Sequence, residues 1–325
     1  MRVLIPDAKF TDPADIERQA VAHEPSGPDF SFIPHHAVHQ TDIAPGEWPS
    51  CEAVIAYDEV RLDAPWLNRL EQCRVIVRAG VGFDNVDLET AGALGIAVCN
   101  VPDYGTTDVA DHAIAMLLTL TRGTTVYDAA MRADPVGGWH FATPPLMRRL
   151  RGRVFGVVGL GRIGLATALR AKALGMEVVF HDPYRPSGTE LALGFRRADS
   201  LSALMADSDV VSLHTPLTPE TNGMLDAVAF SAAKPGQILV NTARGPVVVL
   251  GMCMHRCLLR VHAPLLAACA CTAACCMCMH LLWCSSAPLL LCSSACSAAC
   301  RMCMRLLWCS SGAPLLLRLL LCSSA

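Results

Sequence analysis

The sequence has no excess of basic charge, because its 26 Lys and Arg are outnumbered by 29 Asp and Glu, for a net charge of -3. A strong positive field is what proteins use to bind nucleic acid or an anionic membrane. We therefore expect small-molecule partners, without direct nucleic-acid binding and without membrane attachment. The opening sequence MRVLIPDAKFTDPADIERQA also lacks the apolar core and cleavage site of a signal peptide, which predicts a cytoplasmic location.

Cysteine is scarce over most of the chain, and the 325 residues contain two different compositions. Only Cys51, Cys73 and Cys99 of the 17 cysteines precede residue 250. From residue 250 to 325 there is no Asp, Glu, Lys, Asn, Gln, Ile, Phe or Tyr, and MCMH or MCMR recurs with a period of 25 residues. Ordinary globular domains are not built from such a composition.

The tail, residues 249–325, fits none of the usual interpretations of a repetitive segment well. A solenoid would need polar faces and turn residues at fixed offsets, and a membrane span at 281–300 is weakened by its serines and proline. A metal site would use Cys269, Cys271, Cys275, Cys276 and Cys278. Paired CxxC units are absent there, so no metal site is predicted. The favoured hypothesis is a low-complexity tail translated from DNA that is not the original coding sequence.

A cofactor-binding unit is predicted in the middle of the chain. The apolar run Val154–Val158 leads directly into GLGRIG at 159–164 and then into a helical pattern that ends at Gly175. In a strand, tight turn and helix of this kind, the first glycine permits the turn, the second admits a pyrophosphate and the third allows close packing. We expect Gly159, Gly161, Arg162, Ile163 and Gly164 to bind a dinucleotide.

Asp182 indicates which dinucleotide is bound. It ends a second strand, Glu177–His181, 18 residues beyond Gly164. An acid at this place binds the adenosine ribose hydroxyls and repels a 2'-phosphate, which favours NAD over NADP, although Arg185 lies nearby. Further strands are predicted at 210–214 and 237–241, alternating with helices, so the fold class is α/β with a doubly wound parallel sheet.

Four sequence blocks extend the pattern beyond one motif: RAGVGFDNVD at 78–87, NVPDYGTTDVADHAIAMLL at 100–118, VGLGRIG at 158–164, and LHTPLTPET through NTARG at 213–245. In order and spacing they resemble the D-isomer-specific 2-hydroxyacid dehydrogenase family, which includes phosphoglycerate dehydrogenase and the C-terminal-binding-protein corepressors. The resemblance covers residues 1 to about 248.

The resemblance implies a flavodoxin-like substrate domain at 1–101 and a Rossmann NAD-binding domain at 102–248, truncated before the tail, with the active site between them. It implies that the backbone amides of Val81 and Gly82 hold the substrate carboxylate. Arg244 matches the catalytic arginine, whose guanidinium can grip a carboxylate and polarise a carbonyl. The resemblance also implies that Thr215, Thr242 and Ala243 line the cofactor, and His214 is expected to be structural.

Hydride transfer to a ketone also needs a proton donor, which in this family is a histidine paired with a glutamate beyond the matching arginine. No glutamate follows Arg244 in this sequence, and His255, His262 and His280 lie in the repeats. His112 and His140 are interpreted as structural. The predicted function is NAD-dependent hydride transfer with a small D-2-hydroxy or 2-oxo acid, impaired in this chain. The alternative is a non-enzymatic, NAD-responsive corepressor-like protein. The resemblance further implies a homodimer, through the helix at 107–120 and the arm to Arg151.

Overall fold

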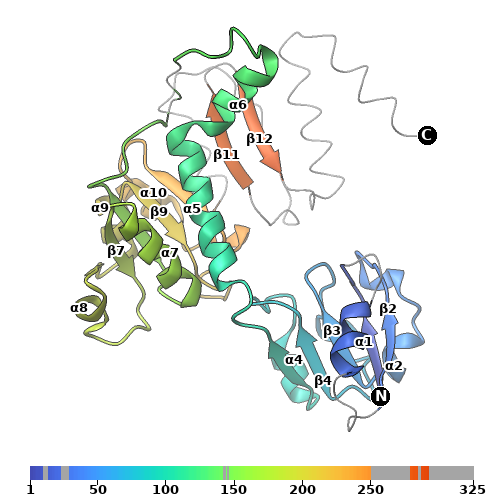
Figure 1. Ribbon diagram of the computed structural model, residues 1–325. Coiled ribbons are helices and arrows are strands. Elements are labelled where there is room, and N and C mark those ends of the chain that lie inside the picture. Colours follow the sequence, from blue (N-terminus) through green and yellow to red (C-terminus); the bar gives the residue numbers. More distant parts are fainter. Residues whose placement is uncertain are drawn as a thin grey trace. The chain divides into compact units, whose positions relative to one another are not determined.

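The computed structural model describes residues 1–9, 14–22, 29–141, 144 and 146–249, together with the backbone of 279–284 and 287–292. The chain divides into two compact units, Met1–Asp108 and Val109–Ala325. Figure 1 shows both, coloured along the sequence.

The first unit is built on a parallel sheet with the strand order β2-β1-β3-β4-β5. This is the flavodoxin-like order, in which helices connect neighbouring parallel strands. Its strands are short, and β1 and β3, which lie inside the sheet, are mostly buried, whereas the edge strands β2 and β5 are partly exposed. They are β1 (Arg2–Ile5), β2 (Ser31–Pro34), β3 (Ala53–Ala56), β4 (Val75–Arg78) and β5 (Ala97–Asn100). The helices are α1 (Asp15–Ala22), η1 (Gln40–Asp42), α2 (Glu47–Ser50), α3 (Ala64–Leu67) and α4 (Leu88–Ala93).

Asp7 fixes the chain where it leaves the first strand of this sheet. Its side chain is buried, and its carboxylate accepts the backbone N–H groups of Tyr57 at 2.8 Å, Glu59 at 2.8 Å and Val60 at 3.1 Å. The segment after β3 is thereby tied to the segment after β1. A buried carboxylate is tolerated here because its oxygens are satisfied by several amides.

The second unit contains the parallel sheet β10-β9-β6-β7-β8. Counted within this unit, the order is that of a Rossmann sheet read from one edge, with β6 as its first strand. The strands are β6 (Val154–Val158), β7 (Glu177–His181), β8 (Arg196–Arg197), β9 (Val210–Leu213) and β10 (Ile238–Asn241). The connecting elements are α7 (Arg162–Ala173), α8 (Thr189–Leu193), α9 (Leu201–Asp207), α10 (Ala227–Ala232) and η2 (Gly245–Val247). The predicted α/β fold class, with two parallel sheets, is confirmed.

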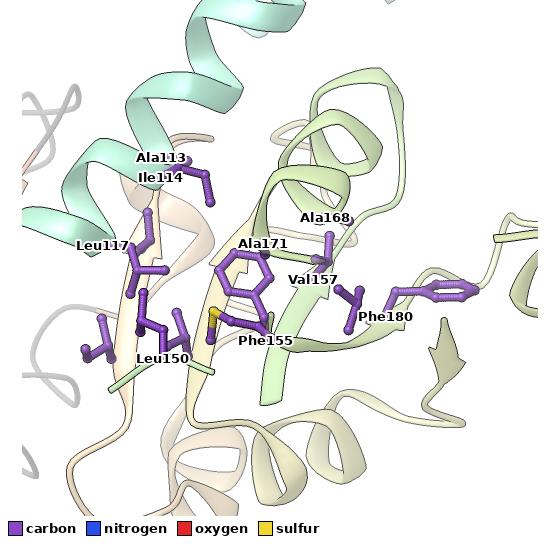
Figure 2. Packing of buried hydrophobic residues seen from close by; sticks show 14 of the residues in the cluster. Ala113, Ile114, Leu117, Leu150, Phe155, Val157, Ala168, Ala171 and Phe180 are labelled. Carbon is purple, nitrogen blue, oxygen red and sulfur yellow. The ribbon is translucent and has the colours of Figure 1, made fainter. Parts of the chain in front are cut away.

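Two further helices lead into this sheet: α5 (Thr106–Arg122) and α6 (Thr124–Ala133). Figure 2 shows Ala113, Ile114 and Leu117 of α5 in one cluster with Phe155 of β6 and Ala171 of α7. Phe155 is almost completely buried, and burying a side chain of this kind contributes about 1.5–3 kcal/mol to folding. The family-block helix expected at 107–120 is therefore a core element of the second unit.

The predicted strand boundaries differ from the structure in small ways. β6 and β7 have the predicted bounds, whereas β9 ends at Leu213 and β10 starts at Ile238, one residue inside each predicted strand. β8 was not predicted. It has two residues, both arginines, and such a pair carries neither an apolar run nor an alternating pattern.

In the tail, the backbone of β11 (Met279–Cys284) and β12 (Ala287–Cys292) forms an antiparallel pair, which was not predicted. The five cysteines considered as metal ligands lie outside the described residues, as does the rest of the tail. Among the helices of the described segments, none is long and apolar enough to cross a membrane.

Candidate active site

The glycine loop joins β6 to α7 at the carboxyl edge of the second sheet. Gly159 has φ +86°, which only glycine adopts readily, and its amide donates to the His181 carbonyl at 3.0 Å. A side chain at Gly164 would come within 2.0 Å of the Gly159 carbonyl oxygen. A side chain at Gly161 would meet nothing within 4 Å. Gly159 and Gly164 are therefore required by the turn itself, whereas Gly161 leaves open space beside the first turn of α7.

The remaining members of the motif start α7. Arg162 is its first residue and is exposed, and Ile163 is half-buried and accepts the Thr167 hydroxyl at its carbonyl. The free amides at the start of a helix attract negatively charged groups such as a pyrophosphate. The binding roles of Arg162 and Ile163 stay predictions.

Asp182 follows β7 and connects its strand to the glycine loop. One carboxylate oxygen accepts the Leu160 amide at 2.8 Å, and the other accepts the Tyr184 amide at 2.9 Å. The Nε atom of Arg185 lies 3.8 Å from the first of these oxygens. The acid predicted from the sequence thus stands beside the loop that it should serve, and the arginine noted beside it is its ion-pair partner.

Arg197 holds the segment that follows Asp182, and sequence reasoning did not find it. Its guanidinium donates to the carbonyls of Asp182 at 3.3 Å, Arg185 at 3.3 Å and Pro186 at 2.8 Å, and it pairs with Glu190 at 2.9 Å. An arginine can serve this many acceptors because it carries five N–H donors in a rigid fork. No motif signals such a role.

Thr215 lies where β9 leaves the sheet, close to the glycine loop. A Cβ at Gly159 would be 2.9 Å from both the Thr215 Cγ2 atom and the His214 carbonyl, so the ends of β6 and β9 nearly touch. The Thr215 Oγ1 atom is buried and has no hydrogen-bond partner among the described residues. Buried hydroxyls usually have one. A dinucleotide bound at the glycine turn could supply the hydrogen-bond partner that this hydroxyl lacks.

His214 has a structural environment. Its Nε2 atom lies 2.8 Å from the Ser212 hydroxyl, and its Nδ1 atom lies 3.4 Å from the Thr242 hydroxyl. Burial lowers the pKa of His214 to about 4, so the ring is neutral at pH 7. A neutral imidazole with both nitrogens engaged supports the structural role expected from the sequence.

The NTARG turn places Arg244 just beyond β10. Asn241, the last residue of the strand, accepts the Ala243 amide at 2.9 Å and donates to the Arg244 carbonyl at 2.9 Å. Arg244 is half-buried, and its Nη1 atom donates to the Ala243 carbonyl at 2.9 Å. The structure therefore brings Thr242, Ala243 and Arg244 to the same sheet edge as the glycine loop, where doubly wound sheets bind ligands.

The predicted substrate loop lies in the first unit, after β4. Val81 and Gly82 are half-buried, and the Asn100 side chain at the end of β5 donates to the Val81 carbonyl at 2.8 Å. Arg78, the last residue of β4, is buried and folds over Gly80, where a Cβ would be 1.3 Å from its Nη1 atom. A side chain at position 80 would therefore displace the Arg78 guanidinium, and a buried cation stands beside the loop. The RAGVG block contained this arginine, but sequence reasoning assigned it no role.

The structural roles expected for His112 and His140 stay predictions. His112 is exposed on α5, and His140 is exposed in the loop after α6. His255 and His262 lie outside the described residues, and His280 contributes only backbone to β11.

Comparisons with known proteins agree with this geometry. Residues 114–252 match the sequence model described as "D-isomer specific 2-hydroxyacid dehydrogenase, NAD binding domain". The chain is 38% identical over 200 residues to D-3-phosphoglycerate dehydrogenase of Mycobacterium leprae, which is 62% of this chain and 37% of that protein. The chain thus spans little more than a third of the length of this curated relative.

Two solved structures share the fold over a larger part of the chain. The structure of D-lactate dehydrogenase from Escherichia coli has 31% sequence identity and a TM-score of 0.63, covering 78% of either chain. D-lactate dehydrogenase from Aquifex aeolicus, solved with NAD and lactic acid, has 27% identity and a TM-score of 0.68, covering 80% of this chain and 74% of that one. With the strand order, the glycine loop and the NTARG turn in place, these similarities show that the chain belongs to the D-isomer-specific 2-hydroxyacid dehydrogenase family.

Proposed function

We propose that this protein binds NAD(H) and acts on a small D-2-hydroxy or 2-oxo acid. The observation that carries this proposal is the convergence of three features at one sheet edge: the glycine loop with its open position at Gly161, the acid Asp182 beside it, and the turn that presents Arg244. The family membership and the relatives named above support the same activity.

In this proposal the cofactor is held by the second unit. The amides of the glycine loop and the start of α7 take the pyrophosphate, Asp182 takes the adenosine ribose, and the hydroxyl of Thr215 finds there the partner that it otherwise lacks. Thr242 and Ala243 line the same edge. Bound NAD(H) would supply or accept the hydride.

The substrate is held by cationic and amide groups. The family resemblance assigns carboxylate binding to the amides of Val81 and Gly82 in the first unit. In the second unit it assigns carboxylate binding and polarisation of the 2-oxo group to the Arg244 guanidinium, which can form paired hydrogen bonds. The buried guanidinium of Arg78 beside the loop supports an anionic substrate, because a buried cation is stabilised by a negative partner.

We further propose that the 325-residue chain turns over 2-oxo acids poorly. No glutamate follows Glu220 within these 325 residues, so they contain no histidine–glutamate pair beyond Arg244. A positioned general acid typically accelerates a reaction about 100- to 10,000-fold. We therefore expect the chain to bind NADH and a 2-oxo acid while reducing the 2-oxo acid only slowly.

The test measures binding and turnover on the same preparation. Titration with NADH should show saturable binding, and a 2-oxo acid such as pyruvate should bind to the NADH complex while NADH oxidation with pyruvate, glyoxylate or hydroxypyruvate stays very slow. Arg244→Ala should weaken pyruvate binding and leave NADH binding nearly unchanged. Arg149→Ala, at an exposed arginine of the same unit, is the matched control.

Two results would contradict the proposal. Absence of NADH binding by folded protein would remove the dehydrogenase function. Rapid NADH oxidation would show that another residue donates the proton and that the chain is not impaired. Binding of NADH without binding of any 2-oxo acid, accompanied by NADH-dependent capture of a transcriptional partner, would instead favour the corepressor-like alternative.

We also propose that two copies form a homodimer through the second unit. α6 has no buried residue, and after it Val136, Trp139 and Phe141 are 90%, 84% and 85% exposed. Large exposed apolar side chains in a group are typical of interaction surfaces. Light scattering should report a dimer that Trp139→Ser weakens, and a monomer for the unmutated protein would exclude it. The cytoplasmic location stays a prediction from the sequence.

A further inference from the structure

Two cysteines stand side by side at the amino ends of neighbouring strands in the first unit. β3 and β4 pair in parallel with Ala53 opposite Val75, so Cys51 and Cys73 occupy matching positions two residues earlier. The Arg74 amide donates to the Glu52 carbonyl at 2.9 Å, which continues the backbone pairing to the residues that follow the two cysteines. Matching positions on parallel strands direct their side chains to the same face of a sheet.

The two thiols are close neighbours in one core cluster, in which Cys51 is fully buried and Cys73 is 8% exposed, and each of them shifts the pKa of the other. Neighbouring strands lie about 4.8 Å apart, which falls within the roughly 4.4–6.8 Å that a disulfide needs between Cα atoms. The backbone therefore does not have to move far for the two sulfur atoms to bond.

The thiols differ in access and in acidity. Cys73 lines a surface hollow together with Arg74, Leu94 and Gly95, whereas Cys51 lies behind it and donates to the Trp48 carbonyl at 3.2 Å. The neighbouring Cys51 thiol lowers the pKa of Cys73, against the opposing effect of burial. The neighbouring Cys73 thiol and burial both raise the pKa of Cys51. Of the two cysteines, Cys73 is thus the one whose pKa is lowered and the one that lines the hollow.

We propose that Cys51 and Cys73 form a redox-active dithiol, a modification site in which a peroxide converts the pair to a disulfide. The Cys73 thiolate attacks one peroxide oxygen, so an S–O bond forms, the O–O bond breaks and hydroxide leaves as water after taking a proton. The Cys51 sulfur then attacks the Cys73 sulfur. An S–S bond forms, the S–O bond breaks, and the hydroxyl leaves as a second water with the Cys51 proton.

In this reaction two thiols lose two electrons in total, and one hydrogen peroxide is reduced to two waters. The site lies at the amino ends of β3 and β4, whereas the predicted substrate loop follows the carboxyl end of β4. The modification therefore does not depend on the proposed dehydrogenase function, and either can fail without the other.

Peptide mapping of the full chain tests the proposal. Trypsin places Cys51 in peptide 19–61, Cys73 in peptide 70–74 and Cys99 in peptide 79–122. The reduced chain is treated with hydrogen peroxide, the remaining thiols are alkylated, and the digest is analysed by mass spectrometry. The expected main product of Cys73 is peptide 70–74 joined to 19–61, weighing two hydrogen atoms less than the separate peptides, and dithiothreitol should reverse it.

Matched variants assign the roles. Cys99→Ser removes an exposed cysteine and should leave the link unchanged. Cys51→Ala should stop the reaction at the Cys73 sulfenic acid, which dimedone traps on peptide 70–74. In concentrated urea the preference for this pair should disappear, since the fold no longer aligns the two strands.

The proposal is overturned if Cys73 of the folded, unmutated chain stays reduced while Cys99 is oxidised. It is equally overturned if Cys73 pairs mainly with a tail cysteine, or passes to sulfinic acid while Cys51 remains a thiol. These outcomes are measured on the unmutated chain, so the proposal can be tested even if Cys51→Ala does not fold.

Discussion

Asp182→Ala should reduce the preference for NADH over NADPH, and the structure gives the reason. A carboxylate offers about four acceptor positions on its two oxygens. In this structure the Leu160 and Tyr184 amides use one position on either oxygen. Two positions remain, which is the number that the two adenosine ribose hydroxyls of NADH require.

The size of the effect follows from these bonds. A hydrogen bond to a charged group contributes about 1.5–3 kcal/mol, so losing even one ribose bond should raise the dissociation constant of NADH about 10- to 100-fold. Solvent screening is limited because the Asp182 side chain is 12% exposed. NADPH should lose less or gain, because the repulsion of its 2'-phosphate disappears and Arg185 is released from its ion pair.

The ratio of the two affinities is the informative quantity. Asp182→Ala also removes the acceptor of the Leu160 amide, and a loosened glycine loop would weaken both cofactors alike. We would titrate the unmutated chain, Asp182→Ala and Asp182→Asn with NADH and NADPH by calorimetry, with Asp199→Ala as a control at an exposed acid of the same unit. Melting curves would verify folding.

Two results would refute the reasoning. If the unmutated chain binds NADPH as tightly as NADH, Asp182 does not select the cofactor. If Asp182→Ala weakens both cofactors by the same factor, the carboxylate only holds the loop and contributes nothing to ribose recognition.

Three further predictions concern the glycine loop, a buried histidine and a buried acid. Gly161→Ala should fold normally but bind NADH at least ~10-fold more weakly, because its methyl group enters open space. Gly164→Ala should also lower the melting temperature, because the methyl group at position 164 would meet the Gly159 carbonyl. Equal melting temperatures for the two variants would contradict this prediction. The pKa of His214 is about 4 in the folded state, below the ~6.5 of a histidine in an unfolded chain. The contribution of His214 to the free energy of unfolding is therefore complete above pH ~6.5 and falls by about 3 kcal/mol as the pH drops to ~4. Urea unfolding of His214→Asn should show a flatter pH dependence, and an unchanged one would disprove the assignment. Asp7→Ala leaves three amides of residues 57–60 without their acceptor and should cost at least ~3 kcal/mol in urea unfolding; a loss below ~1 kcal/mol would show that water replaces the carboxylate.

The parts of the second unit that could be predicted from sequence depend on local pattern. Val154–Val158 and Glu177–His181 are apolar runs that are buried in the sheet, and their bounds were predicted correctly. The glycines were predictable because backbone geometry dictates them, as the +86° φ at Gly159 shows. Since parallel strands end at a common edge, the position of Asp182 beside the loop followed from the same pattern.

The parts that could not be predicted depend on contacts between residues distant in sequence. Arg197 lies on a two-residue strand and acts on carbonyls 11 to 15 positions away, so it has no local signature. The pairing of Cys51 with Cys73 needs the register of two strands, whose ladder starts at Ala53 and Val75. A sequence without aligned homologues gives the strands but not their register.

The two predicted binding loops also share a support that neither motif reveals. Each is held by an asparagine at the end of a strand: Asn100 donates to the Val81 carbonyl from β5, and Asn241 donates to the Arg244 carbonyl from β10. Asparagine suits this position because one short amide side chain carries both a donor and an acceptor, and Asn241 uses both. Aspartate at either position would place an acceptor oxygen against the loop carbonyl, and alanine would leave that carbonyl without its hydrogen-bond donor. The backbone amides of Val81 and Gly82 and the side chain of Arg244, which are proposed to hold the substrate, therefore depend on two asparagines that need not touch it.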